Sequence, residues 1–100
     1  MKNLMRTKKQ IEKMTDEIRK ERKIVRQYDM LTGANNWRIM DSQIRWLKWC
    51  LNQSETATIT AEFNRYDEPA MDDEGKGHDT ALAWVLKQKD DLISEEEEEL

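Results

Sequence analysis

Two segments carry apolar side chains at the spacing that packed helices require, and this pattern constrains the fold more than any other feature of the sequence. In the N-terminal segment an apolar residue recurs every seven positions, at Leu4, Ile11, Ile18 and Val25. The second segment has a 3-4-3-4 seam formed by Trp37, Met40, Ile44, Leu47 and Leu51. Seams of this kind are buried when two helices pack as in a coiled coil. Gly33 and the asparagines after it indicate a turn, with Asn35 or Asn36 as the next N-cap. The sequence therefore predicts an all-α protein built on an antiparallel hairpin of helices 3–31 and 36–53.

The two predicted helices differ in length. The first has about 29 residues and would be ~43 Å long, whereas the second has about 18 residues and ~27 Å. The first turns of the longer helix, which carry Leu4 and Ile11, therefore extend beyond the hairpin and need a cover. The C-terminal segment, a second copy or a different protein could supply it. We expect a homodimer through this end.

Residues 54–66 fit two local structures. A short strand at 56–63 is suggested by the alternation of Ala57, Ile59, Ala61 and Phe63 with polar residues. Ile59, Phe63 and Tyr66 also share one helix face. We favour the helix because a lone strand has no pairing partner in this chain.

The rest of the C-terminal half is predicted as a linker, a helix and a tail. Residues 67–78 contain the only Pro and two of the three Gly, which is typical of a flexible acidic linker. Asp79 is the expected N-cap of a C-terminal helix at 80–93. Residues 1–93 would thus form a single helical domain, followed by a disordered acidic tail at 94–100.

Composition excludes several kinds of site. The chain of 100 residues has one Cys and one His, so it can form neither an internal disulfide nor a Cys/His zinc site. The longest apolar run, at 81–86, is far too short to span a bilayer. No secretory signal is visible near the N-terminus. We expect a cytoplasmic protein without membrane association, metal or cofactor.

No arrangement of reactive residues predicts catalysis. An EF-hand loop starting at Asp72 would place Lys76 and Ala83 where calcium ligands are needed. The Gly-Lys-Gly sequence at 75–77 lacks the spacing of a phosphate-binding loop. His78 is interpreted as a solvent-exposed loop residue, and Cys50 as part of the helix core. We therefore expect a protein that is not an enzyme.

The tryptophans are the candidates for protein binding. Trp46 and Trp49 lie outside the predicted seam, so they widen the apolar surface of the second helix. Trp84 raises the same question on the C-terminal helix. Exposed tryptophans often dominate protein interfaces, whereas buried ones would belong to the core. Together with Leu4 and Ile11 they are the predicted partner-binding residues, and the core alternative stays open.

Charge is divided strongly along the chain. Residues 1–50 carry a net charge of +7 and residues 51–100 one of −11. The basic face of the first helix is represented by Lys9, Lys13, Lys20 and Lys23. This face has no interleaved aromatic residues of the kind that single-strand binders use. Acidic residues that would imitate a phosphate backbone are Asp72, Asp73, Glu74, Glu95, Glu96 and Glu97.

These patterns favour binding over chemistry. The first hypothesis is a protein-binding module, a small regulator or inhibitor of a larger, nucleic-acid-handling protein. Phage or mobile-element anti-defence proteins are of this type, and the protein would then act in the host cytoplasm. The alternative is a nucleic-acid-associated accessory protein that binds phosphates through the basic face of the first helix.

Overall fold

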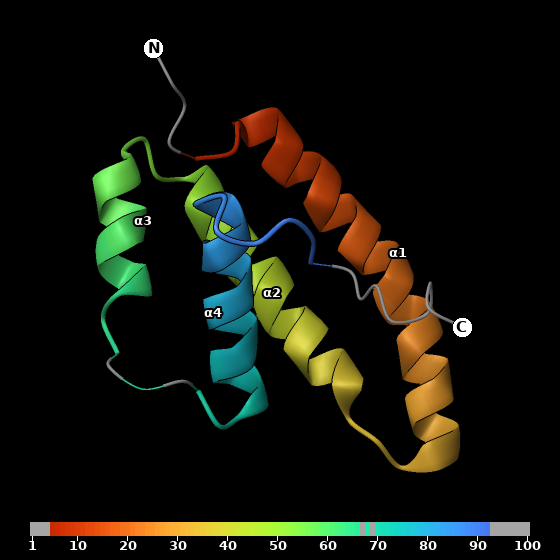
Figure 1. Ribbon diagram of the computed structural model, residues 1–100. Coiled ribbons are helices and arrows are strands. Elements are labelled where there is room, and N and C mark those ends of the chain that lie inside the picture. Colours follow the sequence, from red (N-terminus) through yellow and green to blue (C-terminus); the bar gives the residue numbers. More distant parts are fainter. Residues whose placement is uncertain (1–4, 67, 69, 93–100) are drawn as a thin grey trace.

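Helices are the only regular secondary structure in the part of the chain that the structure describes. The computed structural model describes residues 5–66, 68 and 70–92, and this part contains no strand. Its helices are α1 (Lys8–Thr32), α2 (Asn36–Leu51), α3 (Thr56–Phe63) and α4 (Asp73–Val85) (Figure 1). The predicted all-α hairpin is confirmed, and residues 56–63 form a helix rather than the alternative strand. None of the described helices is both long and apolar enough to cross a membrane.

α1 begins later than predicted because Thr7 caps it. The backbone N–H of Gln10 donates to Thr7 Oγ1 at 3.1 Å, and the Gln10 side chain accepts from the Thr7 N–H at 2.8 Å. This reciprocal pair is a capping box, which satisfies two N–H groups at the start of a helix. Residues 5–7 are therefore not helical, and Leu4 lies outside the described residues. α1 ends at Gly33, whose left-handed φ of 81° suits glycine.

A carboxylate from α1 caps α2. Asn35 occupies the N-cap position, but its side chain makes no capping hydrogen bond. Instead the buried Asp29 accepts from the Trp37 N–H at 2.9 Å and from the Asn36 side chain at 3.2 Å. Asp29 thus ties the end of α1 to the start of α2 and fixes the turn between them.

The C-terminal helix lies earlier in the chain than the predicted range of 80–93. Asp72 is its N-cap and accepts from the Gly75 N–H at 2.9 Å, so Asp79 lies inside the helix. The predicted N-cap is therefore wrong, and residues 73–78 of the predicted linker are helical. Acids in the first turn, Asp73 and Glu74, interact favourably with the helix dipole. Ile93 and the predicted tail at 94–100 lie outside the described residues.

α4 ends where the backbone becomes left-handed. Lys87 has a φ of 64°, and the Gln88 N–H turns back to the Ala83 carbonyl at 2.8 Å. This hydrogen bond closes the helix in the manner of a C-terminal cap that usually contains glycine. The helix therefore ends before the predicted residue 93. Leu86 and Leu92 after this turn are nevertheless buried in the core.

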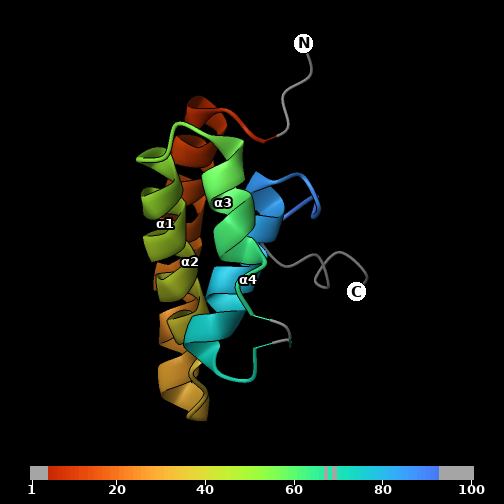
Figure 2. The same cartoon turned by 90° about the vertical axis from the view of Figure 1, so that its left-hand side faces the viewer.

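The helices form two layers. α1 and α2 make the hairpin, and α4 packs mainly on α2 with α3 beside it (Figure 2). Gly77 allows the close approach of α4, because a Cβ there would lie 2.7 Å from the Ile39 carbonyl oxygen and still closer to Ser42. The fully buried side chains at the centre include Ile18, Leu47, Ile59, Leu82 and Val85.

The overhanging start of α1 is covered by the chain itself. The Arg6 N–H donates to the Val85 carbonyl at 2.8 Å, and the Arg6 side chain donates to the Trp84 carbonyl at 2.9 Å. Ile11 is 1% exposed and Trp84 is 4% exposed. Of the three covers considered for this end, the C-terminal segment is the one observed. Ile11 and Trp84 therefore offer no surface to a partner in this conformation.

Candidate functional site

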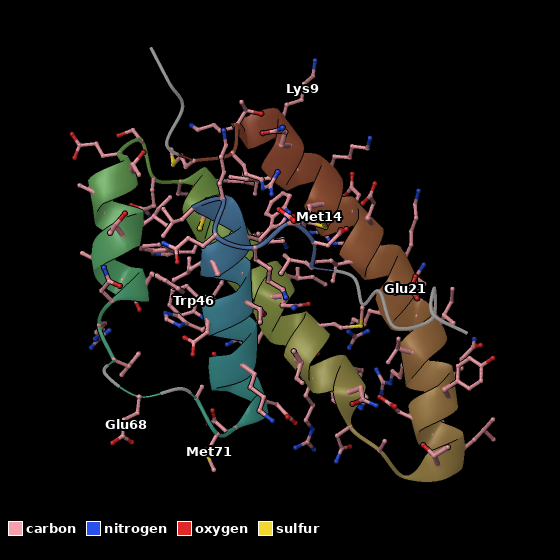
Figure 3. All side chains as sticks on the ribbon, in the orientation of Figure 1. Lys9, Met14, Glu21, Trp46, Glu68 and Met71 are labelled. Atoms are coloured by element: carbon pink, nitrogen blue, oxygen red, sulfur yellow. The ribbon has the colours of Figure 1, made fainter. Side chains whose placement is uncertain are left out.

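A pocket lies between α2, the loop that follows α3, and the first turns of α4. It has a volume of about 650 Å³. Its aromatic side chains are Trp46, Tyr66 and His78, and its carboxylates are Glu68, Asp72, Glu74 and Asp79. Figure 3 shows Trp46 in the space between α3 and α4, and Glu68 on the loop that joins them. The pocket thus combines an aromatic wall with an acidic rim.

His78 forms part of the pocket wall and is held on both sides. The side chain of His78 is buried, so its interpretation as an exposed loop residue is wrong. Nδ1 lies 2.8 Å from Asp79 Oδ1, and Nε2 lies 3.0 Å from Glu62 Oε2. The ring therefore links α4 to α3. Since both nitrogens already have carboxylate partners, neither is free to act as a general base on a bound molecule.

The aromatic rings of the pocket meet edge to face. The Trp46 ring lies 4.5 Å from the His78 ring and 5.4 Å from the Trp49 ring, measured between centroids. Tyr66 meets the other side of His78 at 5.8 Å. The indole N–H of Trp46 is buried and has no hydrogen-bond partner. Trp46 is thus partly core and partly pocket wall, and Trp49 is half-buried beside it.

The carboxylates are only partly neutralised. Glu74 pairs with Arg45 of α2, and Asp72 is occupied by the cap of α4. Asp79 holds His78 and also accepts from the Ala70 N–H at 3.4 Å. Glu68 has no ion-pair partner among the residues described. A positively charged group would therefore find both carboxylates and aromatic rings in this pocket.

The opposite charge gathers around another tryptophan of α2. The guanidinium carbons of Arg22, Arg26 and Arg38 lie 5.4, 5.1 and 5.4 Å from the centroid of the Trp37 ring. Arg22 also makes a two-pronged ion pair with Asp41 of α2. Trp37 belongs to the predicted seam between the two helices of the hairpin. In the structure its ring is half-buried and also lies close to three arginine side chains.

The predicted basic and acidic residues are only partly brought together. Lys9, Lys13, Lys20 and Lys23 are exposed along α1, and within the described residues they form no ion pairs. Asp72 and Glu74 line the pocket, whereas Asp73 is half-buried at the start of α4. Glu95, Glu96 and Glu97 lie outside the described residues.

Several site residues carry no recognisable signal in the sequence. Glu62 and Tyr66 meet His78 only because α3 folds back against α4. Arg38 follows Trp37 directly in the sequence, but Arg22 and Arg26 reach the same ring only because the hairpin closes. Gly77 was assigned to a linker, although a glycine inside a helix often marks a close helix contact.

Reactive and metal-binding groups are not assembled in the described part of the chain. Burial raises the pKa of the Cys50 thiol to about 12, so the nucleophilic thiolate is scarce at neutral pH. In residues 5–66, 68 and 70–92 there is no group of three or more His, Cys, Asp or Glu side chains placed to hold a metal ion.

Comparison with known proteins adds no relative. No protein-family model matches the sequence, and neither the curated proteins nor the solved structures contain a match.

Proposed function

We propose that this chain is a non-enzymatic protein-binding module whose pocket receives a basic segment of its partner. One observation carries the proposal: a cavity of about 650 Å³ has aromatic walls and a rim of four carboxylates. A lysine or arginine side chain is the common protein group that suits both features. Its cation would face the aromatic rings, and its N–H groups would bond to the carboxylates.

The neighbouring structure supports a binding role for the pocket. His78 is locked between Glu62 and Asp79, and Asp72 is fixed by the cap of α4, so the walls are organised before any ligand arrives. Preorganised walls lower the entropy cost of binding. In addition, among the described lysines and arginines only Arg45 pairs with a carboxylate of the rim. The rim therefore keeps an excess of negative charge.

A basic partner also suits the proposed biological role. Proteins that handle nucleic acid expose Lys and Arg for phosphate contacts. An acidic pocket that occupies such a side chain would make the chain a regulator or inhibitor of that protein. An origin in a phage or mobile element, and action in the host cytoplasm, belong to this proposal.

The proposal can be tested with short peptides and the four indole N–H signals of the ¹⁵N-labelled protein. A peptide with an arginine or lysine between neutral residues should shift the Trp46 signal, which a Trp46→Phe variant identifies. The same peptide with glutamate at that position should leave the signal in place. Equal shifts with both peptides, or no shift with either, would refute a cation-binding pocket.

A charge-matched pair of variants locates the effect. Glu68→Gln with Asp72→Asn removes two rim charges, and Asn keeps the cap of α4 because it is as good an N-cap as Asp. Glu12→Gln with Glu55→Gln removes two exposed charges outside the pocket. We expect the first pair to weaken peptide binding by about tenfold and the second pair to have little effect.

A further inference from the structure

The arginines around Trp37 form a second charged site, separate from the pocket. Arg22 and Arg26 belong to α1, and Arg38 belongs to the first turn of α2. Their guanidinium groups all lie within about 5.5 Å of the same ring, the range of cation–π attraction. Cation–π attraction to the shared indole ring partly offsets the mutual repulsion of these three like charges.

Within the described residues, two of these cations have no partner of opposite charge. Arg22 is neutralised by Asp41 through a two-pronged ion pair. The side chains of Arg26 and Arg38 are exposed and make neither a hydrogen bond nor an ion pair with any described residue. Stacking on an aromatic ring uses the face of a guanidinium and leaves its N–H edge available for an anion.

The helix that carries Arg22 and Arg26 also carries exposed lysines. Lys20 and Lys23 are exposed on α1 within two turns of Arg26, and Lys13 and Lys9 follow towards its N-terminus. The sequence of α1 shows no aromatic residue among these cations. The fold adds one, because the hairpin brings Trp37 from α2 between Arg22 and Arg26.

We infer that Arg26 and Arg38, which lie over the Trp37 ring, form a contact site for the phosphodiester backbone of a nucleic acid. The N–H edge of a guanidinium matches two phosphate oxygens at once. The lysines of α1 offer further phosphate contacts along a rigid helix of 25 residues. A repeating anion is therefore a better fit than a single one. This inference goes beyond the protein-binding proposal, because the pocket contributes none of these residues.

The test is fluorescence anisotropy with the whole chain and a labelled oligothymidylate as the probe. We expect binding at low salt that weakens steeply as salt is raised. Arg26→Gln with Arg38→Gln should weaken binding by about tenfold and reduce the salt slope by about one to two. No binding by the wild type at low salt would overturn the inference.

Two control pairs separate this site from general positive charge. Lys9→Gln with Lys13→Gln removes the same charge at the far end of α1 and should weaken binding by only about twofold to threefold. Arg26→Lys with Arg38→Lys keeps the charge but loses the planar group, so most of the loss should remain. Equal losses from the Arg→Gln and Lys→Gln pairs, or full binding by the Arg→Lys pair, would contradict the inference.

A competition experiment tests the chemistry of the anion. Polyglutamate carries repeated charge but no phosphate, so it should displace the oligothymidylate much less well than unlabelled oligothymidylate does. Equal displacement would show that the site takes any polyanion and would overturn the assignment to nucleic acid. Helical circular dichroism spectra of all variants, matched to the wild type, ensure that these comparisons concern folded chains.

Discussion

Trp37 and Trp46 lie on the same helix but in opposite electrostatic surroundings. Three arginines surround Trp37, whereas Trp46 lines a pocket with four carboxylates. The two residues are nine positions apart on α2, which is about two and a half turns, so they point to opposite sides of the helix. One side faces α1, and the other faces α3 and α4.

The difference shows how one helix can serve two binding surfaces. α2 contributes an aromatic ring to each side, and the neighbouring elements decide the charge around it. The basic residues near Trp37 come largely from α1, and the acids near Trp46 come from α4 and the loop before it. The charge division of the sequence thus becomes a division in space across α2.

The largest expected effect is a change that separates α4 from α2. In Gly77→Ala the new methyl group would meet Ser42 and the Ile39 carbonyl oxygen, so α4 would have to move. We expect a loss of about 3 kcal/mol in unfolding free energy, measured by urea denaturation. The indole signal of Trp46 should shift, and that of Trp37 should not.

Gly33→Ala is the matched control for this substitution. Gly33 has a positive φ, but a methyl group there would meet no atom within 4 Å. It should cost only about 1 kcal/mol, the penalty of left-handed backbone for alanine. A Gly77→Ala variant as stable as the wild type would contradict the close packing of α2 and α4.

A smaller effect is expected from the Trp37 side. Asp29→Ala removes the side-chain acceptor that binds the backbone N–H of Trp37 and the side chain of Asn36. The backbone N–H at the start of α2 then loses its hydrogen-bond partner. The unfolding free energy should fall by about 2 kcal/mol. Here the indole signal of Trp37 should move while that of Trp46 stays. Asp29→Asn keeps one acceptor and should lose less; an equal loss would show that the charge matters rather than the cap.

The link between α3 and α4 should contribute less again. Glu62→Gln keeps a hydrogen-bonding partner for His78 Nε2 but removes the carboxylate charge beside the ring. We expect a loss of about 1 to 2 kcal/mol in the same denaturation experiment, together with a shift of the Trp46 signal. Glu55→Gln, at the other end of α3, should change stability by less than about 0.5 kcal/mol. If Glu62→Gln changes the unfolding free energy no more than Glu55→Gln does, the contact between Glu62 and His78 does not stabilise the fold.

The smallest expected effect concerns Cys50, a buried residue in the core of α2, the helix that carries both tryptophans. Cys50 on α2 has its pKa raised from 9.0 to about 12 by burial. The unfolded chain therefore releases this proton first, and stability should fall as the pH rises from 9 towards 12. At pH 10 the loss should be about 1.4 kcal/mol. In Cys50→Ala this component should be absent, so the stability difference between the two proteins should shrink from pH 8 to pH 10.

Part of the fold follows directly from the sequence. The spacing of Ile11, Ile18 and Leu47 predicts two packed helices, and Gly33 ends the first of them. However, the other seam position of this heptad, three residues after Val25, falls on Tyr28, and this residue is 66% exposed. Periodicity predicts on which face of a helix a residue lies, but it does not predict whether another helix packs against that face. α4 packs mainly on α2, and the C-terminal end of α1 keeps Ile24, Tyr28 and Leu31 on its surface.

The candidate site was predicted less completely than the fold. Trp46 and the acids Asp72 and Glu74 were singled out because of their residue types and their positions in the pattern. His78 and Gly77 were assigned to a linker, because glycines argue against a helix when only local preferences are considered. In the structure the glycine is what allows α4 to approach Ser42, so packing outweighs helix propensity.

The sequence by itself determined the helical class, the hairpin and the separation of charge along the chain, since each depends on residues that are near one another. The tertiary structure alone decided which tryptophan meets which charge. It brings Arg26 to Trp37 across the hairpin, and Glu62 to His78 across α3 and α4. Contacts of this kind join residues whose spacing follows no local period, so only the packing of whole helices produces them.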